Sequence, residues 1–443
     1  MTPVTIIGAG WAGLAAAVEL SRQQIPVTVY ESARHIGGRA RDVELDNITV
    51  DNGQHLMIGA YSQLLNLLTL IGVDESQLFS RLPQHICVYD LLTRHSVFDL
   101  KLPRLPAPLH LLAGMFSTPS LSFADKLKTL WHFNRLLHRK LATDISVTQW
   151  LNQSGLPGNY VKHLLYPLCL AALTTHPDLA SARAFQTVLT QTFAGPSQHT
   201  DLLIAKTTLG KTFPDAAKNY IESYGGQILT GHKVTQLNPQ TKTLVVNDAV
   251  IDYQQLIIAT PAQVCQQLLQ THNMFAATTN QLSQLQYEPV CTVYLQYPEP
   301  ISLPLAMIGC VNSVSEWLFD RRYCNQPGLI AVVISAHGEH MIWSNDILTK
   351  KISAELAQLF PAWPQPLHTQ VIREKRAAFR CHTHIDSIRP GINTASNSIK
   401  LCGDYVYIEN NFAAGLPATL EGAVRSGVKC AHLTLQELPA CNT

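Results

Sequence analysis

The first 31 residues carry the pattern that most limits how this chain can fold. An apolar stretch at 4–7 is followed at once by Gly8-Ala-Gly10-Trp-Ala-Gly13, then by an Ala- and Leu-rich helical stretch and a second apolar stretch at 27–30. A strand, a glycine turn, a helix and a second strand, in that order, are typical of a Rossmann-type βαβ unit. The sequence therefore predicts an α/β fold whose parallel sheet begins here.

The three glycines and Glu31 have separate expected roles in binding a dinucleotide. Gly8 permits the tight turn, Gly10 lets the backbone approach a pyrophosphate, and Gly13 lets the helix and the strand pack closely. The helix N-terminus offers free N–H groups and a positive dipole to the phosphates. Glu31 can accept hydrogen bonds from both ribose hydroxyls. A glycine turn with packing duties alone would leave Glu31 unexplained, so the pattern predicts dinucleotide binding.

The residues after Glu31 favour FAD over a nicotinamide dinucleotide. Five residues separate Glu31 from Gly37-Gly38-Arg39, an arrangement that resembles the FAD-binding pattern of the amine oxidase and carotenoid desaturase superfamily. The resemblance implies that Gly38 helps to turn the chain back and that Arg39 makes a charge-assisted contact to the pyrophosphate. The alternative for Arg39 is an ordinary surface arginine. Gln24 is a departure, since the family usually has Gly where the chain leaves the helix.

Two later segments resemble further FAD contacts of this superfamily. Residues 51–55, Asp-Asn-Gly-Gln-His, resemble the loop that passes beside the flavin ring. Residues 225–234 resemble the strand whose backbone contacts the adenine. The resemblance implies cofactor contacts from Gly53, Gln54 and Val234.

The C-terminal part resembles the last FAD segment of the same superfamily. Gly403 and Asp404 match the Gly-Asp that contacts the pyrophosphate and ribityl, and Leu416 and Pro417 lead into a helix aimed at the flavin. Pro417 suits the first position of a helix, so we expect the helix to begin there with a first turn free of bulk and positive charge. The dipole of such a helix would stabilise the negative charge of reduced flavin. The segment 405–414 is several residues longer than usual.

The resemblance implies two domains, and the chain of 443 residues is long enough for both. The first is a Rossmann-type FAD-binding domain, similar to that of glutathione reductase, formed by residues 1–75, 205–265 and 395–435. The second is an inserted α+β substrate domain formed by residues 76–204 and 266–394. The first insert is mostly helical in its periodicity. The second combines strands, including 290–295 and 329–334, with a helix at 347–360.

Composition limits the partners of the chain. Charged residues make up 14% and apolar residues 46%, which predicts large internal surfaces or an apolar cavity. A net charge of +1 without basic runs indicates no nucleic-acid binding. No two of the ten cysteines have C-x-x-C spacing, so we expect reduced thiols. Cys381, His382 and His384 lack a second cluster, so we expect no metal site.

The apolar stretches are too short to cross a membrane. None reaches the ~18–20 apolar residues of a spanning helix, and the N-terminus lacks the basic region of a signal peptide. We therefore expect a cytoplasmic, soluble protein, or one attached peripherally to the inner face of the cytoplasmic membrane. The apolar segment at 109–116, LHLLAGMF, fits both core packing and a membrane-facing patch.

Several stretches outside the FAD motifs resemble the squalene-associated FAD proteins of bacterial hopanoid pathways, the hydroxysqualene dehydroxylases. They are DNGQHLMIGAY, LYPLCLAALTTHPDLASARAF, SEWLFDRR, REKRAAFRC and GLPATLEGAVRSG, and the resemblance extends over essentially the whole chain. It implies a reductive reaction in which the protonated hydroxyl of hydroxysqualene leaves as water and hydride from reduced flavin gives squalene. A dry apolar cavity would hold the isoprenoid and keep water from the cation.

The reaction needs a proton donor near the leaving hydroxyl. His55 is the expected donor because its loop should border the flavin, with Tyr405 and Tyr407 as weaker candidates. Packing, or a contact to the ribityl, is the alternative role for His55. No second dinucleotide fingerprint is present, so the sequence identifies no electron donor and gives no support for direct NAD(P)H binding. It also gives no oligomeric state.

Two other functions remain as alternatives. An oxidative relative, such as a carotenoid-type desaturase or an amine oxidase, would share the FAD motifs. Amine oxidases commonly carry a lysine on a strand that contacts the flavin, and residues 288–294 hold none. The second alternative is a non-catalytic lipid escort of the same architecture without a working flavin. Gly403, Asp404 and Arg39 argue against an escort.

Overall fold

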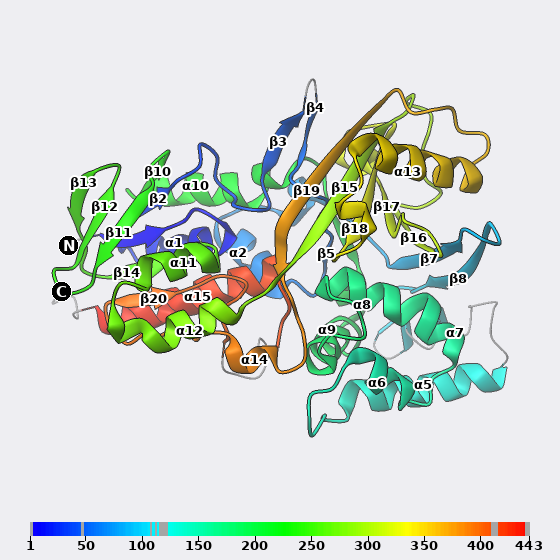
Figure 1. Cartoon of the computed structure of the whole chain (residues 1–443), viewed down its shortest axis with the longest axis horizontal. Coiled ribbons are helices and arrows are strands. Elements are labelled where there is room, and N and C mark those ends of the chain that lie inside the picture. Colours follow the sequence, from blue (N-terminus) through cyan, green and yellow to red (C-terminus); the bar gives the residue numbers. More distant parts are fainter. Residues whose placement is uncertain are drawn as a thin grey trace.

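The computed structural model describes residues 3–45, 48–106, 109–110, 113–114, 123–408 and 415–438. A parallel sheet and its helices form one side of the molecule, and a second sheet with a separate group of helices forms the other (Figure 1). Two long neighbouring strands, β15 (Tyr287–Gln296) and β19 (His368–Phe379), run from the first side into the second.

Three distant segments of the chain build the parallel sheet. Its order is β10-β2-β1-β14-β20, and every neighbouring pair is parallel. The strands span Val4–Ile7 (β1), Val27–Glu31 (β2), Gln227–Thr230 (β10), Leu256–Ile258 (β14) and Ile399–Leu401 (β20). They come from all three ranges predicted for the FAD-binding domain, whose boundaries stay a prediction. Ligands of such sheets bind at the carboxyl ends of the strands.

The helix between β1 and β2, α1 (Trp11–Arg22), is buried along nearly its whole length. The helices α10 (Phe213–Ser223) and α15 (Leu420–Glu437) both pack on it. A Cβ on Gly427 of α15 would overlap the carbonyl oxygen of Ala12, so α1 and α15 cross in close contact at this glycine. The helices α1 and α15 therefore pack as one unit beside the glycine turn.

Shorter elements surround the parallel sheet. An antiparallel sheet contains β11 (Val234–Asn238), β12 (Thr243–Val246) and β13 (Ala249–Asp252). A hairpin contains β3 (Asp42–Leu45) and β4 (Ile48–Asp51). A small sheet has the order β5 (Met57–Ile58), β9 (Leu202–Ala205), β6 (Phe79–Leu82). The short helices are α2 (Ser62–Leu70), α3 (Glu75–Leu78), α11 (Ala262–Leu269), α12 (Ala276–Gln284) and α14 (Ile385–Ile388).

The second sheet has seven strands in the order β19-β15-β18-β17-β16-β7-β8. Besides β15 and β19, its strands are β7 (His85–Asp90), β8 (His95–Lys101), β16 (Met307–Val311), β17 (Trp317–Asp320) and β18 (Leu329–Ser335). Successive side chains along each strand point to opposite faces of this sheet. Val332 and Leu318 belong to a core with Leu348 and Ile352 of α13 (Asn345–Leu359). The residue after Val332 faces the opposite way, toward a cavity described below.

A group of helices lies under the cavity side of this sheet (Figure 1). It contains α5 (Phe123–His138), α6 (Val147–Asn152), α7 (Gly158–Tyr160), α8 (Tyr166–Leu173) and α9 (Ala182–Phe193), with a π-helical turn at Val161–Leu165. Within the described residues, the 3-10 turns are Ser197–Thr200, Leu209–Lys211, Asn273–Phe275, Arg321–Cys324 and Glu339–Met341.

The strands expected at 290–295 and 329–334 and the helix expected at 347–360 are confirmed. The expectation of a mostly helical first insert is wrong for residues 79–101, which form β6, β7 and β8. The hairpin of β7 and β8 turns through Arg94 at a φ of 60° and extends the second sheet through β16. Gln24, which stands where the family usually has Gly, adopts the left-handed conformation at a φ of 59°.

Candidate active site

A cavity of about 650 Å³ extends from the carboxyl ends of the parallel strands to the face of the seven-stranded sheet. Most of the predicted site residues line it: Gly8, Gly10, Glu31, Gly38, Arg39, Gly53, Gln54, His55, Val234, Gly403, Asp404 and Leu416. Gly13 and Pro417 are not among the lining residues. Segments from both ends of the chain thus meet around one space.

The glycine turn leaves open space in front of α1. Gly8 has a φ of 105°, and a Cβ there would lie 2.7 Å from the carbonyl oxygen of Ala259. A Cβ on Gly13 would overlap the carbonyl oxygen of Gly8, so Gly13 serves the packing of the helix. A Cβ on Gly10 would meet only the Cα of Gly38, at 3.9 Å, because the cavity lies beyond it. The backbone between Gly10 and Gly38 fits the close approach of a diphosphate.

Glu31 joins the glycine turn to the chain that follows β2. Its Oε2 accepts a hydrogen bond from the Ala9 N–H at 2.8 Å, and its Oε1 accepts one from the Ala33 N–H at 2.8 Å. A carboxylate oxygen can accept more than one hydrogen bond. Glu31 therefore fixes the turn and still offers acceptor sites to the cavity, as a ribose contact requires.

Arg39 and Asp404 form an ion pair at the middle of the cavity. Nη2 of Arg39 lies 2.6 Å from Oδ1 of Asp404, and Nη1 donates to the carbonyl oxygen of Ala377 at 2.8 Å. Burial opposes the charge of Arg39, but the carboxylate of Asp404 outweighs it and raises the pKa of the guanidinium. Arg39 is therefore a permanent cation, held in one orientation by β19 and by the Gly-Asp turn.

A buried arginine anchors the loop at 51–55. Arg321 is 1% exposed, and its Nη1 donates to Oδ2 of Asp51 and to Oε1 of Gln54, both at 2.7 Å. Asp51 also accepts from the Leu209 N–H at 2.6 Å through Oδ1. The hydroxyl of Tyr294 donates to the carbonyl oxygen of Asp51 at 3.0 Å. We did not predict this role for Arg321, although it lies in the SEWLFDRR stretch.

His55 has its proton on the nitrogen that faces the backbone. Nδ1 lies 3.0 Å from the carbonyl oxygen of Gly53, which can only accept, so Nδ1 carries the hydrogen. Burial lowers the pKa of His55. The imidazole is therefore neutral at pH 7, and its Nε2 accepts a proton more readily than it donates one.

The helix at the C-terminus begins later than expected. It starts at Leu420, and the Thr419 Oγ1 accepts a hydrogen bond from the Gly422 N–H at 3.0 Å as an N-cap. The prediction that Pro417 is its first residue is wrong. Its first turn carries no positive charge, as expected, but it is not free of bulk, because it contains Leu420 and Glu421. The Glu421 carboxylate accepts from the backbone N–H of Gln63 at 2.9 Å. This contact with α2 is tertiary, and so the local sequence did not predict it.

A second buried arginine joins the Gly-Asp turn to the start of α15. Arg389 is 6% exposed, and its guanidinium donates to the carbonyl oxygens of Asp404 and Val406, each at 3.0 Å. It also donates to those of Tyr405 at 3.2 Å and Leu416 at 2.9 Å. One side chain thus positions both flanks of the long segment predicted at 405–414, of which residues 409–414 lie outside the described residues.

Beyond the loop at 51–55, the cavity becomes an apolar chamber. The seven-stranded sheet contributes Met307, Trp317, Phe319 and Val333, and the helices contribute Leu168, Phe185, Val188 and Phe193. The Gln54 N–H contacts Thr292 Oγ1 at 3.4 Å, and the sheet register places Val333 opposite Thr292. The flavin-side loop therefore lies directly against the sheet that forms the wall of the chamber.

One acidic group adjoins this wall. Ser335 lies two residues beyond Val333 on the same face and lines the cavity, and its N–H donates to Oε2 of Glu316 at 2.8 Å. Burial raises the pKa of Glu316 to about 8, so its carboxyl is mostly protonated at pH 7. We did not predict Glu316, although it too lies in the SEWLFDRR stretch.

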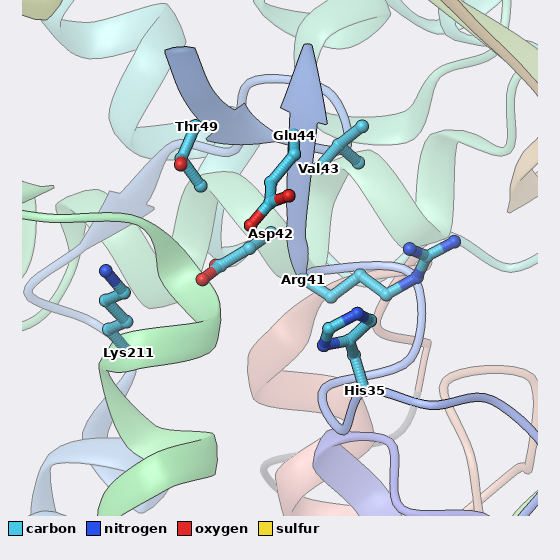
Figure 2. Close-up of a pocket in the computed structure, with 7 residues that line it drawn as sticks. All are labelled: His35, Arg41, Asp42, Val43, Glu44, Thr49 and Lys211. Carbon is cyan, nitrogen blue, oxygen red and sulfur yellow. The ribbon is translucent and has the colours of Figure 1, made fainter. Parts of the chain in front are cut away.

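A smaller pocket of about 270 Å³ lies beside the β3–β4 hairpin (Figure 2). It shares no lining residue with the main cavity. Its lining residues are His35, Arg41, Asp42, Val43, Glu44, Thr49 and Lys211. Acids and bases are mixed there, and Asp42 Oδ1 accepts from the Gly210 N–H at 3.0 Å. That hydrogen bond ties the hairpin to the turn before α10.

Comparisons with known proteins agree with this geometry. The profile of the family described as flavin containing amine oxidoreductase matches residues 11–435. The chain is 28% identical to a hydroxysqualene dehydroxylase of Sinorhizobium fredii, with 98% of each chain covered. It is 22% identical to a zeta-carotene desaturase of Arabidopsis thaliana, over 96% of this chain and 83% of the relative. An oxidoreductase from Methanosarcina mazei has the same fold, with a TM-score of 0.76 at 16% identity over 97% and 99% of the two chains.

The cradle between Gly10 and Gly38, the oriented cation of Arg39 and the acceptor Glu31 all suit FAD. With a family match over almost the whole chain, the conclusion follows that this protein belongs to the flavin containing amine oxidoreductase family and is an FAD-dependent oxidoreductase.

Proposed function

We propose that this enzyme removes the hydroxyl group of hydroxysqualene reductively and releases squalene. The observation that carries the proposal is a chamber of apolar side chains that continues directly from the FAD cradle. Such a chamber suits a long isoprenoid better than a polar amine. The similarity to a hydroxysqualene dehydroxylase over 98% of both chains supports the same substrate.

The reaction balances with one proton and one hydride. The carbon–oxygen bond breaks as the hydroxyl takes up a proton and leaves as water, and a carbon–hydrogen bond replaces it. FAD, when bound and reduced, supplies the hydride. The apolar side chains of the chamber exclude water, which would otherwise capture the cation.

We propose Glu316, acting through the Ser335 hydroxyl, as the source of the proton. The carboxyl is protonated at neutral pH, and Ser335 is its polar contact on the chamber wall. His55 stays the other candidate. A neutral imidazole with its hydrogen directed at Gly53 fits a positioning role for the loop better than proton donation.

For FAD itself, we propose contacts from the predicted residues that line the cavity. Glu31 and Val234 would contact its adenosine end, and Gly10, Gly38 and Arg39 would contact its diphosphate; all five residues line the cavity. Gly53, Gln54 and Leu416 would border the flavin, while Gly403 and Asp404 complete the middle. Gly8 and Gly13 shape the turn.

Anaerobic product analysis tests the proposed reaction. The purified protein is photoreduced without oxygen, mixed with hydroxysqualene and extracted, and squalene should form in step with reoxidation of the flavin. Phytoene given to the oxidised enzyme is the comparison, because the chain also resembles zeta-carotene desaturases. A desaturated product from phytoene, with hydroxysqualene untouched, would falsify the proposal and favour the oxidative alternative.

A further inference from the structure

The helix α5 exposes apolar side chains along one line of its outer surface. Leu127 is 48% exposed and Trp131 is 60% exposed, and Phe123, four residues before Leu127, is 69% exposed. Residues four apart lie on the same face of a helix, so the three form a continuous apolar stripe. Single exposed apolar residues are ordinary, but an aligned row that includes tryptophan marks an interaction surface.

The opposite side of α5 is apolar as well, and it is already packed. Leu136 and Leu137 are buried, and the Phe133 ring lies 5.7 Å from the Phe193 ring of α9. The Thr190 hydroxyl of α9 donates to the carbonyl oxygen of Leu137 at 3.1 Å. A helix that is apolar on both sides is normally buried on both sides. We therefore expect the outer stripe of α5 to contact a second apolar environment.

Basic side chains flank the stripe. At 100° per residue, Lys128 and Arg135 fall along one edge of the exposed arc, and Arg139 follows directly after the last residue of α5; all three are exposed. The guanidinium of Arg135 lies over the Trp131 ring, 5.6 Å from its centroid. Residues 123–140 contain five Lys or Arg and one acidic residue. The surface around the stripe is thus cationic although the whole chain is nearly neutral.

We propose that this outer face of α5 docks on an anionic lipid bilayer. Tryptophan prefers the interface between lipid and water, and apolar side chains enter the boundary of the acyl chains. Lys and Arg beside them attract anionic head groups. No helix in the described part of the chain is long and apolar enough to cross a membrane, so docking in the plane is the geometry that α5 offers.

The position of α5 gives docking a purpose. Phe193, which contacts α5 through Phe133, also lines the apolar chamber. The docked face is therefore one helix layer from the chamber, and an apolar molecule leaving the bilayer would have a short path to it. Half of the segment at 109–116, predicted as a membrane patch or core, lies outside the described residues, and α5 carries this proposal without it. The proposal also does not depend on which reaction the enzyme catalyses.

Vesicle binding tests the proposal without any turnover. FAD-loaded protein is co-sedimented with vesicles of phosphatidylcholine alone and with vesicles in which phosphatidylglycerol makes up about one third. We expect binding to the anionic vesicles that weakens as salt is added. The variant Leu127→Ser/Trp131→Ser should bind at least about tenfold more weakly. The variant Lys128→Gln/Arg139→Gln should lose about fivefold per charge on anionic vesicles only.

The matched control is Leu92→Ser/Ile342→Ser, which removes two apolar side chains that are 77% and 85% exposed elsewhere. It should bind vesicles like the unaltered protein. The flavin absorbance and melting temperature of each variant establish that it is folded. Unaltered protein that ignores anionic vesicles overturns the proposal, as does equal binding by the α5 variants. A dimer in gel filtration that Leu127→Ser/Trp131→Ser dissociates would also overturn it, because a second copy would then cover the stripe.

Discussion

Arg39 and Asp404 are 365 residues apart in the chain, yet Nη2 of one lies 2.6 Å from Oδ1 of the other. The ion pair lines the cavity and joins the glycine-rich segment near the N-terminus to the Gly-Asp turn near the C-terminus. Because Asp404 satisfies one edge of the guanidinium, Arg39 is oriented before any cofactor arrives. Its remaining donors are therefore available to a diphosphate.

Replacement of Arg39 should weaken FAD binding more than it weakens the fold. A hydrogen bond to a charged group contributes about 1.5–3 kcal/mol, so Arg39→Ala should raise the FAD dissociation constant by roughly 10- to 100-fold. Arg41→Ala is the matched control, since Arg41 lines the small pocket instead (Figure 2). Titration of apoprotein with FAD, followed by flavin fluorescence, measures both. Equal affinities in the two variants would contradict the assigned role.

Arg389 should contribute far more to the stability of the fold than Arg39 does. Arg389→Gln leaves several buried carbonyl oxygens without their donor, and we expect it to lower the free energy of unfolding by about 3–5 kcal/mol. Arg322→Gln is the control, because Arg322 also donates to a carbonyl oxygen, that of Leu303, but is itself 39% exposed in its side chain. Denaturant unfolding monitored by circular dichroism compares the two. A loss below about 1 kcal/mol for Arg389→Gln would show that the joined segments hold without it.

Glu316 should make the protein less stable as the pH rises. Its pKa is raised to about 8 in the folded state from an ordinary value of 4.5, so folding takes up a proton between these values. The resulting loss in the free energy of unfolding is absent below about pH 4.5, grows as the pH rises toward 8, and is then constant. Glu316→Gln should therefore stabilise the protein at pH 7, on the order of 3 kcal/mol, and leave it nearly unchanged at about pH 4. Melting temperatures across this range test the effect, and parallel curves would refute it.

Glu316 and His55 can be compared as proton donors in the reaction itself. If Glu316 supplies the proton through Ser335, Ser335→Ala should slow the step that consumes hydroxysqualene by about 10²- to 10⁴-fold. His55→Gln should slow it by less than about tenfold, since the imidazole is neutral and its donor faces Gly53. Single-turnover reoxidation of the reduced flavin without oxygen reports the step directly. The reverse ranking of the two variants would assign proton donation to His55.

The sequence predicted the parts of the site that depend on local geometry. The positive φ of Gly8 and the lack of room for a Cβ on Gly13 favour glycine at these two positions, so local spacing predicted the turn. Glu31 ends the strand that follows, and Gly8, Gly10 and Glu31 all line the cavity. The sequence placed the start of α15 too early. Thr419 caps the helix, and its hydrogen bond fixes the start more strongly than the favourable backbone angle of Pro417 does. Arg321 acts through Asp51, 270 residues away, and Glu316 acts through Ser335 of a neighbouring strand; periodicity carries no information about such pairs.

The close crossing at Gly427 has a consequence for how the protein is made. Because synthesis runs from the N-terminus, Ala12 leaves the ribosome before Gly427, which lies 415 residues later in the chain. A nascent chain that has completed the glycine turn must therefore wait for those residues before α1 acquires its permanent neighbour. A stop codon anywhere before α15 would leave α1 without this support.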